Sequence, residues 1–177
     1  MRDARASDAA TLVAIWNGIA SPDRSEVASA TDEQTARAIA RLEADPAERL
    51  LVALLDDVLV GVAHVRRAPI SPIHDEDAVH VGNLHVLRDS RRRGVGSSLM
   101  AAAADWAEEK DSRHIIASVA ASARDSNRFL ARLGMGQAAT VRASTVAGLR
   151  ARLGHAVAKP VSTNVVAARR LMRRARG

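Results

Sequence analysis

The sequence has no cysteine and no tyrosine, and its only aromatic residues are Trp16, Trp106 and Phe129. Without cysteine there can be no disulfide, no thiolate metal site and no cysteine nucleophile. With so few aromatic side chains, the core must be built from Leu, Val, Ile and Ala. No apolar run reaches the roughly 18 residues that span a bilayer, and the N-terminus lacks the apolar stretch of a signal peptide. These absences predict a soluble, cytoplasmic protein without a membrane partner.

Acidic residues are absent after Asp125, so the positive charge is unevenly distributed. The formal net charge is +6, yet the excess of basic residues lies in residues 137–177, and the body before them is slightly acidic. Nearly all of the basic residues are Arg, which together with the abundant Ala indicates a bacterial source with a GC-rich genome. The high isoelectric point is therefore a property of the C-terminal segment.

Helix and strand signals alternate along the chain. Thr31 followed by Gln34 has the form of a capping box, which predicts a helix start, and Gly134 is a normal helix stop. The expected helices are 4–20, 31–44, 95–110, 125–133, 146–153 and 162–176, and the expected strands are a very short one at the N-terminus, then 50–55, 58–65, 79–87, 115–119 and 135–144. This alternation indicates an α/β fold with a mixed sheet flanked by helices.

Residues 79–100 carry the clearest functional signal. A strand is followed by the loop Arg91-x-x-Gly94-x-Gly96 and then by a helix that begins at about Val95. Glycines leave backbone N–H groups open to a ligand. The first N–H groups of a helix have no partner within it, and the positive end of the helix dipole lies behind them. Three consecutive arginines add charge, so the segment predicts a phosphate-binding site.

This segment has other interpretations. Glycines after a strand often form only a turn, and the arginines could be a solvated charge run. A Rossmann dinucleotide site requires Gly-x-Gly-x-x-Gly near the first strand of a βαβ unit, with an acidic residue about 20 residues later. Here the third glycine is missing and the unit lies in the middle of the chain. The turn residues, the helix start and the positive charge all favour phosphate as the ligand of this segment.

Three motifs in order give the chain a family resemblance. They are the strand ending in Leu84-His85-Val86 before Arg91-x-x-Gly94-x-Gly96, the next strand at 115–119, and the run from Phe129 to Met135. Together they resemble the GCN5-related N-acetyltransferase (GNAT) family. The resemblance implies a mixed, mostly antiparallel, twisted sheet of about six to seven strands, with a V-shaped cleft between the two central parallel strands. It also implies an acetyltransferase domain at 1–144, followed by a basic helical extension at 145–177.

The resemblance further implies acetyl-CoA as the co-substrate. Strand residues would offer backbone groups to the pantetheine arm, and N–H groups of the loop would hold the pyrophosphate. Asn127 would replace the asparagine of the family, whose position falls on Ala123. The implied cofactor-binding residues are Leu84, His85, Val86, Arg91, Arg92, Arg93, Gly94, Val95, Gly96, Ser97, Ser98 and Asn127. No set of His, Asp and Glu has the spacing of metal ligands, so no metal is expected.

Acetyl transfer to an amine needs a group that takes the proton of the amine. The candidates for this base are His80, His85, Glu76 and Asp77, and histidine titrates in the useful range. Strand alternation puts His80 and His85 on opposite faces unless a bulge intervenes. Each of them could instead be a surface or packing residue. His64 and His74 are weaker candidates.

The departing thiolate is often protonated by a tyrosine in this family, and the corresponding residue here is Leu130. Expelling the bare thiolate at neutral pH costs on the order of 2 kcal/mol, which a water or Ser126 could relieve. Because there is no cysteine, the amine must attack directly within a ternary complex. We therefore expect an N-acetyltransferase that acts on a primary amine of a small molecule or peptide. The alternative is a catalytically weak acyl-CoA-binding protein with a regulatory or interaction role.

The basic C-terminus has three interpretations. Its expected helix at 162–176 could pack on the body or on a second subunit, which would give a homodimer. It could also be a solvated tail, or it could bind nucleic acid through charge. No aromatic residues lie among these arginines, so nucleic acid is disfavoured as a partner.

Overall fold

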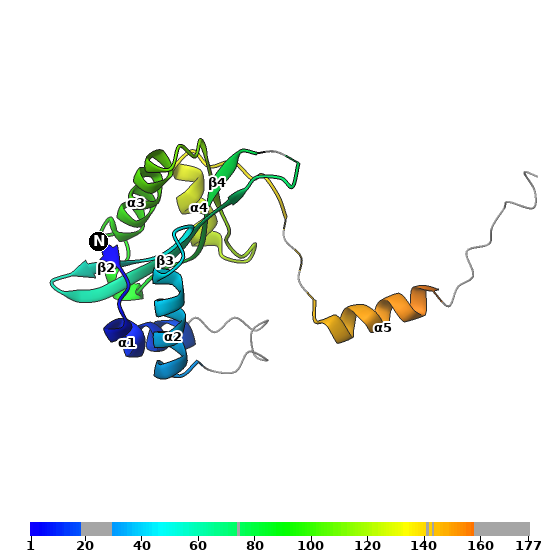
Figure 1. Ribbon diagram of the computed structural model, residues 1–177, viewed down its shortest axis with the longest axis horizontal. Coiled ribbons are helices and arrows are strands. Elements are labelled where there is room, and N and C mark those ends of the chain that lie inside the picture. The colour runs from blue at the N-terminus through cyan, green and yellow to red at the C-terminus, as the bar shows by residue number, and fades with distance from the viewer. Residues whose placement is uncertain (19–29, 74, 141, 143, 158–177) are drawn as a thin grey trace, which may run out of the picture. The chain divides into compact units, whose positions relative to one another are not determined.

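The computed structural model describes residues 1–18, 30–73, 75–140, 142 and 144–157 (Figure 1). The chain forms two compact units, Met1–Met135 and Gly136–Gly177. The first unit holds the sheet and most of the helices. In the second, α5 (Val146–Val157) begins where a helix was expected and runs one turn longer. The helix expected at 162–176 lies outside the described residues.

The first unit is built on a sheet with the strand order β1-β2-β3-β4-β5. From β1 to β4, each strand is antiparallel to the next, and β5 runs parallel to β4. The strands are β1 (Arg2–Asp3), β2 (Glu48–Leu55), β3 (Val58–Pro69), β4 (Asp77–Val86) and β5 (His114–Ala117). This mixed, mostly antiparallel sheet confirms the expected fold class.

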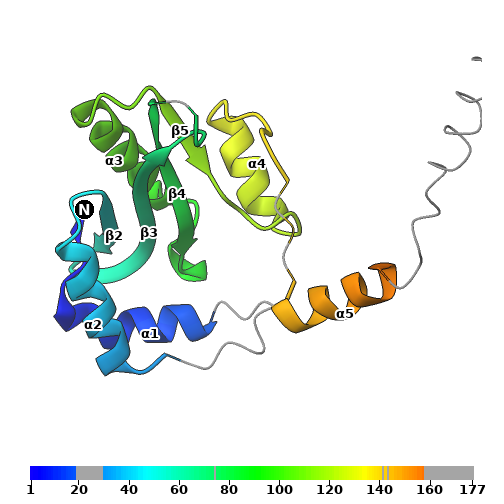
Figure 2. The ribbon, with the colours of Figure 1, turned by 45° about the vertical axis from the view of Figure 1, so that its right-hand side comes forward.

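Helices cover both faces of this sheet, with α3 on one face and α1 and α2 on the other (Figures 1 and 2). They are α1 (Ala9–Gly18), α2 (Asp32–Glu43), α3 (Val95–Glu109) and α4 (Arg124–Arg132), with short 3-10 turns at Ala6–Asp8 and Arg88–Ser90. Helix α2 begins as expected, because the Thr31 Oγ1 accepts from the N–H of Gln34 and the Gln34 side chain accepts from the N–H of Thr31.

Each face of the sheet has its own aliphatic core. On the α3 face, Leu99, Ala103 and Trp106 pack against β2, β3 and β4. On the other face, the inward side chains of α1 and α2 pack against Leu50, Val52, Leu59 and Val62. That second core covers only part of its face, because His64 and Glu48 on the neighbouring part are each about one-quarter exposed.

The sheet has five strands within the described residues, where about six to seven were expected. The difference lies in the segment 135–144, because its described residues form no strand. That run contains three alanines and Gly136, residue types that gain little from packing on a pleated surface. Strand β3, in contrast, runs beyond the expected end to Pro69, where it still pairs with Asp77 of β4.

Candidate functional site

The ladder between β4 and β5 is short. It runs from the pair Ala78–His114 to the pair Val81–Ala117, and one more hydrogen bond follows from the Ser118 N–H to the Val81 carbonyl, at 2.9 Å. Strand β4 continues for five residues beyond this pairing, to Val86. Figure 2 shows the two strands separating there. In the described part of the chain, no strand pairs with this edge of β4, so its backbone is open to a ligand.

A β-bulge lies in the same stretch of β4. His64 of β3 pairs with Gly82, but Val62 pairs with His85, so β4 has one extra residue between these two pairs. Asn83 takes up the extra length with a φ of 50°, in the left-handed region. As a result, His80 and His85 point to the same face of the sheet, the face of α1 and α2. The expectation that they lie on opposite faces held only for a strand without a bulge.

The two histidines have different surroundings on that face. His80 is half-buried, and its Nε2 is buried without a hydrogen-bond partner in the described structure. Burial lowers the pKa of His85, and the positive charge of Arg91 lowers it further. Both effects favour the neutral imidazole, which is the form that accepts a proton.

The predicted phosphate loop follows β4 directly. The Arg91 Nε donates to the Val86 carbonyl at 3.2 Å, which fixes the start of the loop. Gly94 is the N-cap residue of α3, with a φ of 81° that a side chain would strain. No side chain caps this helix. Gly94 and the three arginines are exposed, so a concentrated positive charge lies beside the positive end of the α3 dipole.

Helix α4 packs against the start of α3. A Cβ at Gly96 would lie 3.3 Å from Phe129 Cζ, so glycine is needed for this approach. Asn127 uses its side-chain amide to hold the preceding loop, donating to the carbonyls of Ala120 and Ala123 at 3.0 and 2.9 Å. Leu130 is buried in the core of the α3 face, and Ser126 is half-buried on α4.

Glu76 lies apart from His80 and His85. It precedes β4 at the hairpin end, six residues before Gly82, which is roughly 20 Å along a strand. There it lies 3.9 Å from His114 and is about half exposed. The structure therefore places His80 and His85 on the same face of β4 and leaves Glu76 at the other end of the strand. His74 and the segment 19–29 are outside the described residues.

One interaction on the α1–α2 face was not anticipated from the sequence. Glu48 of β2 and His64 of β3 form a hydrogen bond, with 2.9 Å between Oε2 and Nε2. The two residues are 16 positions apart, and only the register of β2 on β3 brings them together. His64 was a weak candidate and Glu48 was not one, because no local motif connects them.

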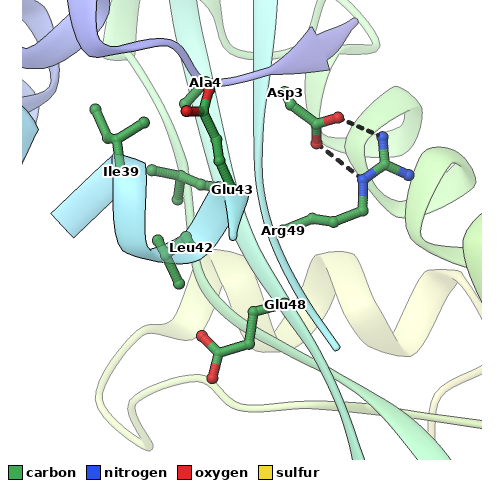
Figure 3. Close-up of a pocket in the computed structure, with 8 residues that line it drawn as sticks. Asp3, Ala4, Ile39, Leu42, Glu43, Glu48 and Arg49 are labelled. Atoms are coloured by element: carbon green, nitrogen blue, oxygen red, sulfur yellow. Dashed lines mark hydrogen bonds and ion pairs between the residues drawn. The ribbon is translucent and has the colours of Figure 1, made fainter. Parts of the chain in front are cut away.

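Two shallow hollows lie around the end of α2, and Leu42 and Glu48 line both of them. Their volumes are about 220 and 290 Å³. Figure 3 shows the first, where the carboxylate of Glu48 lies apart from the ion pair of Asp3 and Arg49. No residue of the predicted cofactor loop lines either hollow, so we do not assign the cofactor to them.

Comparison with known proteins agrees with this geometry. The family model described as "Acetyltransferase (GNAT) family" matches residues 13–135. A search of curated proteins finds no match. Across the described ranges, no helix combines the length and apolarity that a membrane span requires.

Several solved structures share the fold. A transcriptional regulator from Bacillus halodurans C-125 has a TM-score of 0.71 and 20% identity, over 81% of this chain and 97% of its own. The aminoglycoside N-acetyltransferase AAC(6')-Iy in complex with CoA has a TM-score of 0.66 and 17% identity, over 81% and 91%. Glucosamine-6-phosphate N-acetyltransferase from Arabidopsis thaliana has a TM-score of 0.67 and 13% identity, over 82% and 96%.

These likenesses show the fold, and the family model covers more than half of the chain. Of the motifs that suggested the family, Leu84-His85-Val86 ends β4 and Arg91-x-x-Gly94-x-Gly96 leads into the start of α3. The chain belongs to the GNAT family of acetyltransferases.

Proposed function

We propose that this protein moves the acetyl group of acetyl-CoA directly to a primary amine of a small molecule or peptide. One observation carries the proposal. The open edge of β4 leads into a glycine–arginine loop and the uncapped start of α3. The solved structure of a GNAT-fold aminoglycoside N-acetyltransferase with CoA supports the same donor.

The donor site combines two kinds of backbone recognition. The pantetheine arm carries amide groups, which can pair with the open edge of β4 as an added strand would. The pyrophosphate is anionic, and the first N–H groups of α3 together with Arg91, Arg92 and Arg93 attract it. The three arginines are exposed, so a ligand can reach them without displacing the core.

The transfer of the acetyl group requires few side chains. The amine must lose a proton before its nitrogen attacks the acetyl carbon, and His80 and His85 are on the face where they could take it. A backbone N–H near Val86 would stabilise the oxyanion that forms. The carbon–sulfur bond then breaks, and the thiolate leaves with its electron pair. No acetyl-cysteine can form in a chain without cysteine.

One observation favours the alternative of a weakly catalytic acyl-CoA-binding protein. Leu130, at the position of the family's tyrosine, is apolar and only 6% exposed. It can neither protonate the thiolate nor reach it through a hydrogen bond. A regulatory protein would need only the donor site. The two functions differ in whether acetyl-CoA is consumed.

The donor site is tested by calorimetric titration with CoA. Arg93→Glu and Gly94→Glu should abolish binding, because each puts a carboxylate where the pyrophosphate would lie. Arg113→Glu is the matched control, since Arg113 is exposed beyond the other end of α3, and it should bind like the wild type. Wild-type affinity in both loop variants would contradict the proposed site.

The activity is tested by release of free CoA thiol from acetyl-CoA in the presence of a panel of primary amines. Thiol release that depends on the amine supports the transferase. Tight binding of CoA with no release across the panel would favour the alternative.

A further inference from the structure

The α1–α2 face of the sheet has an empty position beside the bulge. Gly82 has no side chain, and a Cβ there would meet no atom within 4 Å. Gly82 also directly follows Val81, the last residue of β4 that pairs with β5. The open space over Gly82 therefore lies where the strands separate, which is where the proposed function puts the thioester.

His64 borders this space. It pairs with Gly82 across β3 and β4, and cross-strand neighbours have Cβ positions about 5 Å apart. His80 borders the same space from two residues along β4. By register, the strand positions of His64 and His80 therefore flank Gly82 on this face. Proton transfer is a chemistry that an imidazole at this position can perform.

Glu48 fixes the state of the His64 ring. A carboxylate accepts hydrogen bonds and does not donate, so the Nε2 that lies 2.9 Å from Glu48 Oε2 must carry the hydrogen. The neutral ring then has its lone pair on Nδ1, which is ready to accept a proton. When His64 gains that proton, the carboxylate stabilises the imidazolium. His80 has no such partner, because its buried Nε2 makes no hydrogen bond in the described structure.

We propose that His64, oriented by Glu48, is the base that takes the proton from the acceptor amine over Gly82. This inference rests on the proposed transferase function. In the step, the ammonium form of the acceptor gives one proton to His64 Nδ1 and becomes a neutral amine. Its nitrogen then bonds to the acetyl carbon, the carbon–sulfur bond breaks, and the second proton of the nitrogen goes with the thiolate. Glu48 is a positioning residue, since it acts through His64.

Other charged groups surround the pair. They are Arg66 on β3, His80 and His85 on β4 and His114 on β5, all on the same face by register, together with Glu43, Arg41 and Asp45 around the hollows that Glu48 lines. His80 is the closest competitor for the role, so the test includes it.

The test compares two acceptors in the full-length protein. At pH 7, n-butylamine is an ammonium ion, as lysine is, whereas hydroxylamine is a much weaker base and is already neutral. Thiol release is measured with each amine, above the uncatalysed background, for the wild type and for His64→Gln, Glu48→Gln and His80→Gln. The matched control is His114→Gln, since His114 is 55% exposed and pairs with Ala78 at the other end of the ladder.

We expect His64→Gln to lower the rate with n-butylamine by about 100-fold and to leave the rate with hydroxylamine nearly unchanged. Glu48→Gln should show a smaller loss with the same selectivity. In His64→Gln the rate with n-butylamine should rise with pH as the free amine forms, and it should rise less steeply in the wild type. CoA affinity should be the same in all variants.

Equal losses with both amines would overturn the inference, because they would indicate a structural role. A selective loss in His80→Gln but not in His64→Gln would overturn it in favour of His80. If the wild type binds CoA but releases thiol with neither amine, the transferase proposal fails and this inference fails with it.

Discussion

His85 shows how one partly buried residue can link folding to pH. Burial and Arg91 lower its pKa from the ordinary value of 6.5, so the folded protein binds this proton more weakly than the unfolded chain does. Below about pH 6.5 the unfolded chain takes up the proton first, and the free energy of unfolding falls as the pH is lowered. The free energy of unfolding stops falling once the pH is also below the pKa that His85 has in the folded protein.

This predicts a difference between the wild type and His85→Gln in urea unfolding measured at a series of pH values. The wild type should lose stability between neutral pH and mildly acidic pH more steeply than the variant. Parallel curves for the two proteins would show that His85 is not the group that carries this dependence.

At the residue scale, the sequence predicted what depends on neighbours in the chain. The arginines, Gly94 and the start of α3 form one continuous segment, so the sequence showed that they lie side by side, and their role in binding phosphate stays a prediction. The His64–Glu48 pair could not, because it depends on which residue of β2 lies beside which residue of β3. The orientation of His85 was equally hidden, since it depends on the bulge.

At the scale of elements, the sheet contains two glycines whose surroundings differ, because one is crowded and the other faces open space. A Cβ at Gly61 would lie 2.9 Å from Val95 Cγ1 and 3.2 Å from the His85 carbonyl oxygen. Gly61 therefore lets α3 approach β3 closely. Gly82 faces open space instead, so its missing side chain matters for what can enter and not for packing.

We predict that Gly61→Ala lowers the free energy of unfolding by about 1–3 kcal/mol through overpacking. Gly82→Ala should leave it unchanged or raise it by up to about 1 kcal/mol, because alanine is favoured over glycine within a strand. Urea unfolding of the two variants beside the wild type measures both effects. A larger loss in Gly82→Ala than in Gly61→Ala would contradict this account of the α3 contact.

Elements with local end signals were predicted well. The Thr31–Gln34 capping box gave the start of α2, and α4 ends two residues before Gly134, as a helix stop of that kind implies. Strand pairing was harder, because it depends on a distant partner. The hairpin of β3 and β4 extends through Arg66 and Pro69, which the sequence marked as loop. The strand expected at 135–144 lacked the apolar alternation that would have anchored it.

At the scale of the whole molecule, the acidic body and the basic C-terminal segment fall in different compact units. The solved structures of the same fold match about four-fifths of this chain and nearly all of their own. We propose that residues 1–144 are the acetyltransferase domain and residues 145–177 are an extension to it.

A chain that ends at Ser144 should therefore unfold in one cooperative transition and bind CoA as the full chain does. Thermal unfolding and calorimetric titration of the two proteins make the comparison. Loss of CoA affinity in the shorter chain would mean that the basic segment contributes to the donor site. If DNA binding by the full chain survives the truncation, the arginines of the extension are not its cause.

The extra residue at Asn83 changes which face of the sheet the later side chains of β4 occupy. Every later residue of β4 faces the side of the sheet opposite to the one that regular alternation would give. Leu84 and Val86 therefore face the core of α3, and His85 faces away from it. Deleting Asn83 would remove the bulge and place Leu84 opposite Ala63 in regular alternation, so those two aliphatic side chains would keep their face. A deletion in the regular part of β4 would instead turn one side of the strand to the wrong face, and it should therefore be far more damaging than deletion of Asn83.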